Sequence, residues 1–220
     1  ALVFDVDGVM TDGGITVTPE GEFLRTFYAK DGYALSLALK KGYRIAIITG
    51  GRGKALQVRF DMIGNLQTNK INAVLGRVEL IHSIGTMHLA EAVSSRVLRR
   101  LDAGELVAPQ RVLIEVNVSG EETKGGFSPD ELRRSMNELQ NLCGIRIEGL
   151  MTMAPRGDKS RARACFAGLR ELRDELRVSS GLELRELSCG MSEDYEIALE
   201  EGSTIVRLGR VVFDPSFEVL

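Results

Sequence analysis

Short apolar runs rich in β-branched residues alternate with amphipathic stretches along the chain, and this alternation limits the fold more than any other feature. It is typical of repeated strand and helix units around a parallel sheet. We expect eight strands in the 220 residues. They are predicted at Leu2–Val6, Tyr43–Ile48, Val58–Ile63, Val78–Ile84, Arg111–Val118, Ile145–Met151, Leu182–Leu187 and Thr204–Val211.

Helices are predicted in the stretches between these strands. They are expected at Asp31–Lys41, Lys70–Gly76, Met87–Leu101, Pro129–Leu142, Arg161–Leu176 and Glu193–Glu201. Ser128, followed by Pro129 and Glu131, predicts a capped helix start. Ile15–Pro19 and Glu22–Tyr28 flank a Glu-Gly turn, which predicts a β-hairpin inserted after the first strand.

The number of predicted units distinguishes two α/β architectures. Eight strand and helix units favour a closed (βα)8 barrel of the TIM type. An open doubly wound sheet uses the same local pattern, usually with fewer strands, and is the alternative. No low-complexity tract or linker marks a boundary, so residues 1–220 are predicted to fold as a single barrel domain.

Charge and cysteine content exclude several classes of function. The 28 Lys and Arg residues face 31 Asp and Glu residues, for a net charge of −3, so we expect no nucleic-acid partner. The 3 cysteines have no paired spacing, which favours a reducing, cytoplasmic environment. No apolar run reaches the roughly 18 residues that cross a bilayer, so we expect no membrane partner. The favoured state is a monomer that binds a small phosphate-bearing molecule.

Two carboxylates stand two residues apart where the chain leaves the first predicted strand. These are Asp5 and Asp7, and Thr49 and Gly50 stand at the same end of the second strand. Paired carboxylates can hold Mg²⁺ while one of them attacks a phosphorus atom. A hydroxyl beside glycine N–H groups can bind a phosphate. This edge is therefore a candidate magnesium and phosphate site.

The string from Asp5 to Gly13, the hairpin and the Thr-Gly-Gly turn at Thr49 resemble the haloacid dehalogenase superfamily, particularly its sugar-acid 8-phosphate phosphatases. The resemblance covers residues 1–56. It implies two units of a flavodoxin-like fold, with Asp5 as nucleophile, Asp7 as acid or base, and Thr49 as phosphate ligand. The superfamily's downstream lysine and acidic pair are missing in context, and Glu193-Asp194 opens a helix instead. We therefore expect any phosphatase activity to be residual.

Two segments near the end of the chain predict an anion site. Gly190, Met191 and Ser192 precede a predicted helix, whose first N–H groups would face the strand ends. Arg207 and Gly209 arrive beside them from the eighth predicted strand. Barrel proteins commonly bind phosphate after their seventh and eighth strands. A phosphate or sulfate ion is the simplest ligand expected there.

From residue 57 onward the chain resembles the pyridoxal phosphate homeostasis proteins, which share a barrel with the N-terminal domain of alanine racemase. The matching strings are Phe60–Lys70, Leu80–Ile84, Val116–Phe127, Gly149–Met153, Leu187–Glu196 and Glu201–Gly209. The resemblance implies that residues 57–220 are a cofactor-binding barrel segment. It also implies that the 5′-phosphate of pyridoxal phosphate is held by Ser188, Gly190, Met191, Ser192, Arg207 and Gly209.

The first quarter departs from that family. The family's Schiff-base lysine stands at the end of the first barrel strand, where this chain has Asp5 and Asp7. We therefore interpret the chain as an engineered chimera without efficient catalysis, which binds pyridoxal phosphate non-covalently. Two alternatives are a residual Mg²⁺-dependent phosphatase and a pyridoxal phosphate carrier that uses another lysine, such as Lys70. His82, inside an apolar strand, is predicted to be a hydrogen-bonded core residue.

Overall fold

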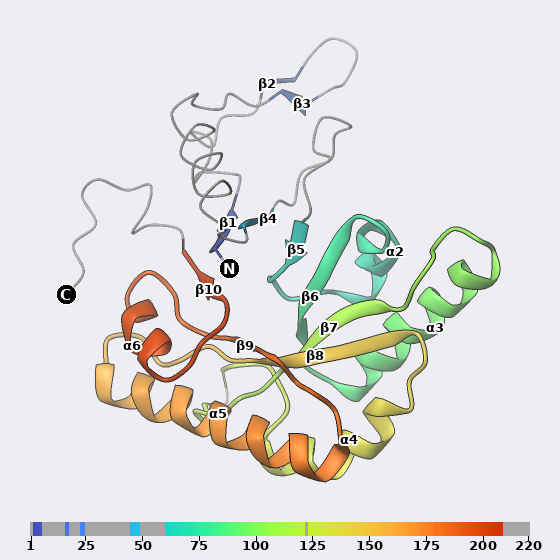
Figure 1. The fold of residues 1–220 in the computed structure, drawn as a ribbon. Helices are drawn as coiled ribbons and strands as arrows, with labels where there is room; N and C mark the ends of the chain where they lie inside the picture. The colour runs from blue at the N-terminus through green and yellow to red at the C-terminus, as the bar shows by residue number, and fades with distance from the viewer. Residues whose placement is uncertain are drawn as a thin grey trace.

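Parallel strands dominate the structure, a computed structural model that describes residues 61–208 apart from residue 122, together with the backbone of residues 2–5, 16–17, 23–24, 45–48 and 60. Within these ranges one sheet has eight strands (Figure 1). They are β1 (Leu2–Asp5), β4 (Ile45–Ile48), β5 (Phe60–Met62), β6 (Val78–Ile84), β7 (Gln110–Glu115), β8 (Ile145–Met151), β9 (Glu186–Ser188) and β10 (Val206–Arg207).

The sheet closes on itself, because its last strand, β10, lies between β9 and β1. Neighbouring strands follow chain order from β1 to β9, and β10 returns to pair in parallel with β1. On its other side β10 adjoins β9, because Ser188 and Ile205 form a parallel bridge and the N–H of Arg207 donates to the carbonyl O of Gly190 at 2.9 Å. The prediction of an α/β barrel built from parallel strands is therefore confirmed.

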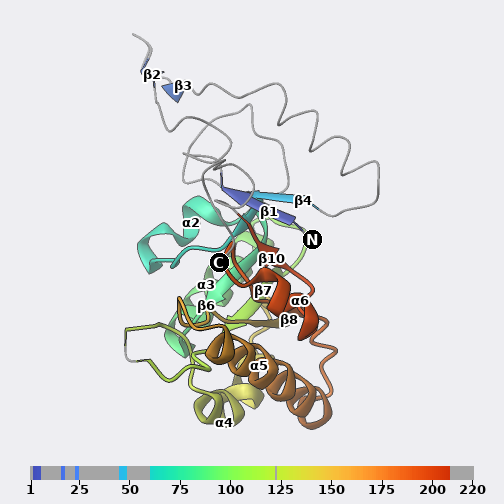
Figure 2. The same cartoon turned by 90° about the vertical axis from the view of Figure 1, so that its left-hand side faces the viewer.

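Helices cover the outer side of the sheet (Figures 1 and 2). Short turns, η1 (Thr68–Lys70) and α2 (Ile71–Val74), follow β5. The longer helices α3 (Met87–Asp102), α4 (Pro129–Gln140) and α5 (Lys159–Ser180) follow β6, β7 and β8, and α6 (Tyr195–Glu200) follows β9. None of the helices in the described ranges has the length and apolar character that a membrane crossing requires.

Alternate side chains of the strands face two different cores. The larger core lies between the sheet and the helices, and includes Ile81 of β6, Ile114 of β7 and Leu169 of α5. A second, smaller cluster contains Leu80, Leu113, Met151 and Ile205, which project to the inside of the barrel. Residues two positions beyond these, toward the carboxyl ends of the strands, therefore also face inward.

Most predicted elements are present, and the differences have local causes. The hairpin is confirmed by the antiparallel pairing of β2 (Thr16–Val17) with β3 (Phe23–Leu24). The strand predicted over Leu182–Leu187 begins only at Glu186, because Leu184 has a φ of 38°, which is incompatible with an extended strand. The helix predicted over Asp31–Lys41 lies outside the described residues.

A capping box begins α4, as the sequence predicts. The Ser128 side chain accepts a hydrogen bond from the N–H of Glu131 at 3.2 Å, and the Glu131 carboxylate accepts one from the N–H of Ser128. Ser128→Ala is expected to lower the free energy of unfolding by about 1 kcal/mol, because one end of the helix loses an acceptor. Urea denaturation measures this. Ser95→Ala, on the exposed face of α3, is the control and should change stability by less than about 0.5 kcal/mol.

Candidate functional site

The carboxyl ends of β8, β9 and β10 meet around the side chain of Arg207. This residue lies two positions beyond Ile205, so it faces the inside of the barrel. Its Nη1 donates to the carbonyl O of Ser188 at 2.9 Å and to Ser188 Oγ at 2.7 Å. Its Nη2 donates to the carbonyl O of Thr152 at 2.9 Å. The guanidinium is thus fixed at the end of the barrel where ligands bind in this architecture.

Arg207 is a buried charge with neutral hydrogen-bond partners. It is 5% exposed, and its bonds go to two backbone carbonyls and one hydroxyl. Among the described residues, Glu115 and Asp194 are the carboxylates whose charges act on it, and neither forms an ion pair with it. Burying a cation without a close counter-charge is costly. The arrangement therefore suits an anionic ligand.

Glu115 and Asp194, the two described carboxyl groups whose charges act on Arg207, are weaker acids than usual. Burial raises the pKa of each carboxyl group, and the positive charge of Arg207 partly offsets that effect. A carboxyl group with a raised pKa is more easily neutralised, which reduces its repulsion of an anion. Sequence reasoning missed Glu115. Its place as the last residue of β7, at the ligand-bearing end of the strands, is the signal that could have identified it.

The segment after β9 makes a tight turn in front of α6. Gly190 has a φ of 91°, and a Cβ atom there would lie 2.5 Å from the Cβ of Ala198, so only glycine fits. The N–H of Met191 donates to Asp194 Oδ1 at 2.6 Å. Ser192 is buried, whereas Met191 is 42% exposed. The predicted anion-site residues Ser188, Gly190, Met191 and Ser192 thus share one short segment beside Arg207, and Gly209 lies outside the described residues.

His82 lies inside the barrel and shares Ser188 Oγ as a hydrogen-bond partner with Arg207. It is 0% exposed, its Nδ1 is 2.9 Å from Ser188 Oγ, and its Nε2 is 3.2 Å from Asp61 Oδ2. Both ring nitrogens have partners, so the prediction of a hydrogen-bonded core histidine is confirmed.

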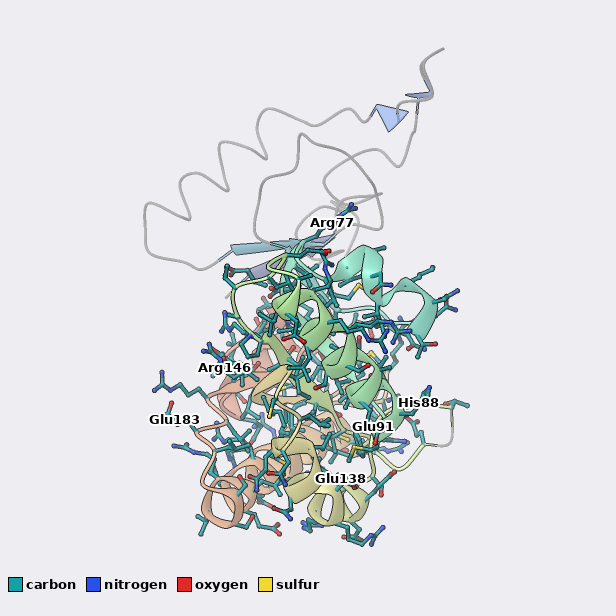
Figure 3. All side chains as sticks on the ribbon, turned by 90° about the vertical axis from the view of Figure 1, so that its right-hand side faces the viewer. Arg77, His88, Glu91, Glu138, Arg146 and Glu183 are labelled. Atoms are coloured by element: carbon teal, nitrogen blue, oxygen red, sulfur yellow. The ribbon has the colours of Figure 1, made fainter. Side chains whose placement is uncertain are left out.

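Acidification is expected to destabilise the protein through His82. Burial lowers the pKa of His82 from its ordinary value of about 6.5. Below that value the unfolded chain binds a proton that the folded chain excludes, so the free energy of unfolding falls as the pH decreases toward the lowered pKa. Urea unfolding at a series of pH values measures the slope. His82→Gln should flatten it, and His88→Gln, at an exposed position of α3 labelled in Figure 3, should leave it unchanged. Equal slopes in both variants would contradict the assignment.

The predicted phosphatase residues do not form a described site. Asp5 is the last residue of β1, where only the backbone is described, and Asp7, Thr49 and Gly50 lie outside the described residues. Within the part of the chain that the structure describes, no three His, Cys, Asp or Glu side chains are grouped so as to hold a metal ion. No finding supports the predicted Mg²⁺ cofactor.

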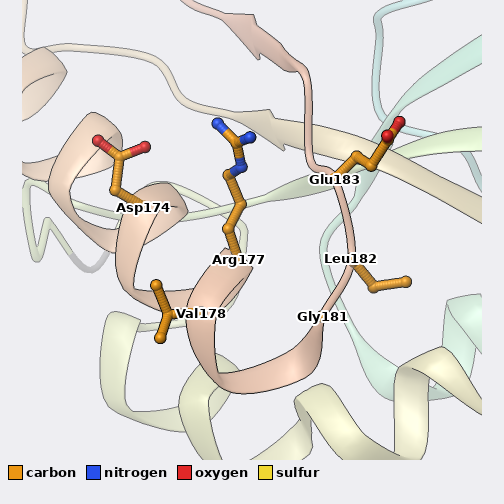
Figure 4. A pocket seen from close by; sticks show the side chains of 6 residues that line it. All are labelled: Asp174, Arg177, Val178, Gly181, Leu182 and Glu183. Carbon is orange, nitrogen blue, oxygen red and sulfur yellow. The ribbon is translucent and has the colours of Figure 1, made fainter.

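A hollow of about 460 Å³ lies at the other end of the molecule (Figure 4). Asp174, Arg177 and Val178 line it from the end of α5, and Gly181 to Glu183 line it from the segment that leads into β9. This is the amino end of β9, opposite the carboxyl end where Arg207 lies. Most of its lining is exposed and it contains no buried polar side chain, so it is the weaker candidate site.

Comparison with known proteins bears on the same part of the chain. Residues 58–216 match the family model described as the N-terminal domain of alanine racemase. A pyridoxal phosphate homeostasis protein of Aquifex aeolicus is 44% identical over 161 residues, which cover 73% of this chain and 68% of that protein. The chain spans about two thirds of the length of the curated relatives, with 65% covered in the Pseudomonas aeruginosa protein of the same name.

Solved structures show the same fold. PipY of Synechococcus elongatus, solved with PLP bound, is 28% identical, with a TM-score of 0.66 over 82% of this chain and 86% of that chain. An alanine racemase of Clostridium difficile is 14% identical, with a TM-score of 0.66 over 100% of this chain and 56% of that one, which shows the fold alone.

These findings overturn the interpretation of the chain as an engineered chimera. The relatives are natural proteins that carry one family name, and their similarity spans the segment with the Arg207 site. The inert chimera and the residual phosphatase of Asp5 and Asp7 are therefore wrong as accounts of function, whereas the use of Lys70 by a carrier stays an untested prediction. Neither the haloacid dehalogenase origin nor a flavodoxin-like part of the barrel is supported. Lys70 itself is an exposed residue that ends η1.

Proposed function

This chain belongs to the family of pyridoxal phosphate homeostasis proteins, whose barrel is the alanine racemase N-terminal domain, and we propose that it binds pyridoxal phosphate at the carboxyl ends of its barrel strands. By holding the free cofactor it would contribute to the homeostasis for which its relatives are named. PLP is bound in the solved PipY relative, which supports the same ligand here.

The observation that carries this proposal is the charge of Arg207, which forms no ion pair with any residue that the structure describes. A guanidinium in a residue that is only 5% exposed, with hydrogen bonds to neutral groups, favours an anion as a further partner. Pyridoxal phosphate brings a phosphate group, whose second pKa is near 6, so that it carries close to two negative charges at neutral pH. The donor chemistry of the site and the charge of the cofactor therefore agree.

We assign the phosphate to the segment Gly190–Ser192, with Arg207 and Gly209 completing the site, and the buried Ser188 supports it by accepting a hydrogen bond from Arg207. The left-handed Gly190 allows the backbone to turn closely against α6, which brings the main chain near the ligand. Asp194 holds this turn by accepting from the N–H of Met191. The bound cofactor would supply a reactive aldehyde, and these residues would hold it by its charge and keep its phosphate in place.

A spectroscopic titration tests the proposal. Pyridoxal phosphate is added to the full chain and its absorbance is followed, with pyridoxal, which lacks the phosphate, as the matched control ligand. Pyridoxal should bind at least about tenfold more weakly, since a charge-assisted contact is worth 1.5–3 kcal/mol. Equal affinities for the two ligands would contradict a phosphate site, and the absence of binding would refute the proposed function.

A further inference from the structure

Four buried or partly buried side chains form one continuous chain of hydrogen bonds through the barrel. Arg207 Nη1 lies 2.7 Å from Ser188 Oγ, which lies 2.9 Å from His82 Nδ1. His82 Nε2 lies 3.2 Å from Asp61 Oδ2, and the Asp61 side chain is 13% exposed. The four residues come from β10, β9, β6 and β5, so the chain crosses the barrel interior from the ligand end of β10 to β5.

Arg207 and Asp61, the two ends of this chain, fix the donor and the acceptor in every hydrogen bond between them. Arginine has five N–H donors and no acceptor, so Ser188 Oγ accepts from Arg207. The one proton of the Ser188 hydroxyl then goes to His82 Nδ1, its remaining partner in the described part of the chain. Asp61 is an acceptor when ionised, so His82 Nε2 carries the proton and donates to it. Arg207 at one end and Asp61 at the other therefore select the same neutral tautomer of His82, the one that carries its proton on Nε2.

We propose that Arg207, Ser188, His82 and Asp61 form a directional relay in which His82 and Asp61 act as positioning residues, holding the Arg207 guanidinium toward the ligand. This inference rests on the proposed function, because orienting Arg207 matters only if Arg207 binds the cofactor. Without the relay the Ser188 hydroxyl would be free to rotate, and Arg207 would keep only its bonds to the carbonyls of Ser188 and Thr152. Arginine binds its partners through a rigid planar fork of donors, so a displaced acceptor changes the direction in which the whole fork points.

Ser188, His82 and Asp61 also have the composition of a nucleophilic Ser-His-Asp triad. The geometry argues against that role. Ser188 is 0% exposed, so no substrate atom can approach its Oγ. The hydroxyl oxygen already accepts from a permanent cation, which lowers its electron density. A serine in this position stabilises a neighbour rather than attacks a substrate.

Protonation of His82 would break the relay. The imidazolium would carry a proton on Nδ1, and the Ser188 hydroxyl would lose its acceptor. The charges that act on His82 come from Asp61 on β5, Glu186 on β9 and Arg207 on β10. Burial is the largest effect against the protonated form and the charge of Arg207 adds to it, while Asp61 and Glu186 favour protonation; the net effect lowers the pKa of His82, so the neutral relay is the stable state near neutral pH.

The first part of the test needs no cofactor. The chain has 2 histidines, and the full-length protein labelled with nitrogen-15 histidine gives a long-range proton–nitrogen NMR spectrum that distinguishes their tautomers. His88→Gln assigns the remaining signals to His82. The relay requires the Nε2–H tautomer with an unprotonated Nδ1 at neutral pH. An Nδ1–H tautomer or an imidazolium at that pH would overturn the relay whether or not the protein binds pyridoxal phosphate.

The second part measures pyridoxal phosphate affinity by the titration described above. His82→Phe should weaken binding about tenfold, because the orienting bond to a charged system is lost. His82→Gln should restore affinity to within about threefold, since its amide offers one acceptor and one donor. Asp61→Leu breaks the relay at its outer end and provides the test if His82→Phe does not fold. Parent-like binding in folded His82→Phe or Asp61→Leu would refute the positioning role.

Discussion

Replacing Arg207 by alanine is expected to lower the affinity for pyridoxal phosphate by on the order of a hundredfold or more. The buried guanidinium is the positive charge that the proposed site offers to the phosphate among the described residues, and truncating one partner of a buried charge pair costs about 2–5 kcal/mol. Arg207→Lys keeps the charge but loses the fork that spans Ser188 and Thr152, so an intermediate loss of about tenfold is expected. Absorbance titration of each variant measures both effects.

Two controls separate ligand binding from folding in this experiment. Arg163 is a matched arginine on α5, which pairs with Glu201 at 2.8 Å on the surface, so Arg163→Ala should leave the affinity unchanged. Circular dichroism and urea unfolding of Arg207→Ala report whether the barrel persists when the carbonyls of Ser188 and Thr152 lose their donor. A folded Arg207→Ala protein with parent-like affinity would place the ligand elsewhere.

The largest loss of stability is expected for Gly149→Ala. A Cβ atom on Gly149 would lie 1.8 Å from the carbonyl O of Glu186 and 2.8 Å from its N, so the clash is with the backbone of the neighbouring strand. Gly149 of β8 is paired directly with Glu186 of β9 in the parallel sheet, so an added Cβ would point into that strand. Because a backbone cannot move aside as a flexible side chain can, we expect a loss of about 4 kcal/mol in unfolding free energy.

Gly64 provides the matched control for that substitution. It is exposed, its φ is not in the left-handed region, and the nearest atom to an added Cβ would be Met62 Cε at 3.9 Å. Gly64→Ala should therefore change the unfolding free energy by less than about 0.5 kcal/mol in urea denaturation. If Gly149→Ala proves as stable as Gly64→Ala, the close approach of β8 and β9 is not as described.

The barrel could be predicted from the sequence, because the periodicity of apolar residues follows the burial of strands and helices directly. Ile145–Met151 was predicted to the residue, since its first four residues alternate between isoleucine and charged residues and it ends in the apolar pair Leu150 and Met151. The strand at Leu182–Leu187 was overestimated because the left-handed turn at Leu184 is a tertiary effect: its buried side chain anchors a backbone conformation that propensity disfavours.

The residues of the candidate site could be proposed from the sequence where they lie in one segment, and they were missed where several strands contribute them. Ser188, Gly190 and Ser192 lie within five residues and have a recognisable string, whereas Glu115, Thr152 and Asp61 approach Arg207 or its partners only after the barrel forms. At Asp5 and Asp7 the error was the opposite, because a site was predicted there that no finding supports. A specific local string was given more weight than the natural family that spans residues 58–216, and this led to the incorrect chimera interpretation.

A crystal structure of the full chain grown with pyridoxal phosphate tests the central claim most directly. The account predicts the cofactor at the carboxyl ends of β8, β9 and β10, with its phosphate on the Gly190–Ser192 segment and an oxygen within hydrogen-bond distance of a donor in the site that includes Arg207. Cofactor bound in the hollow beside Val178, or on exposed Lys70 with Arg207 still facing only neutral groups, would contradict it.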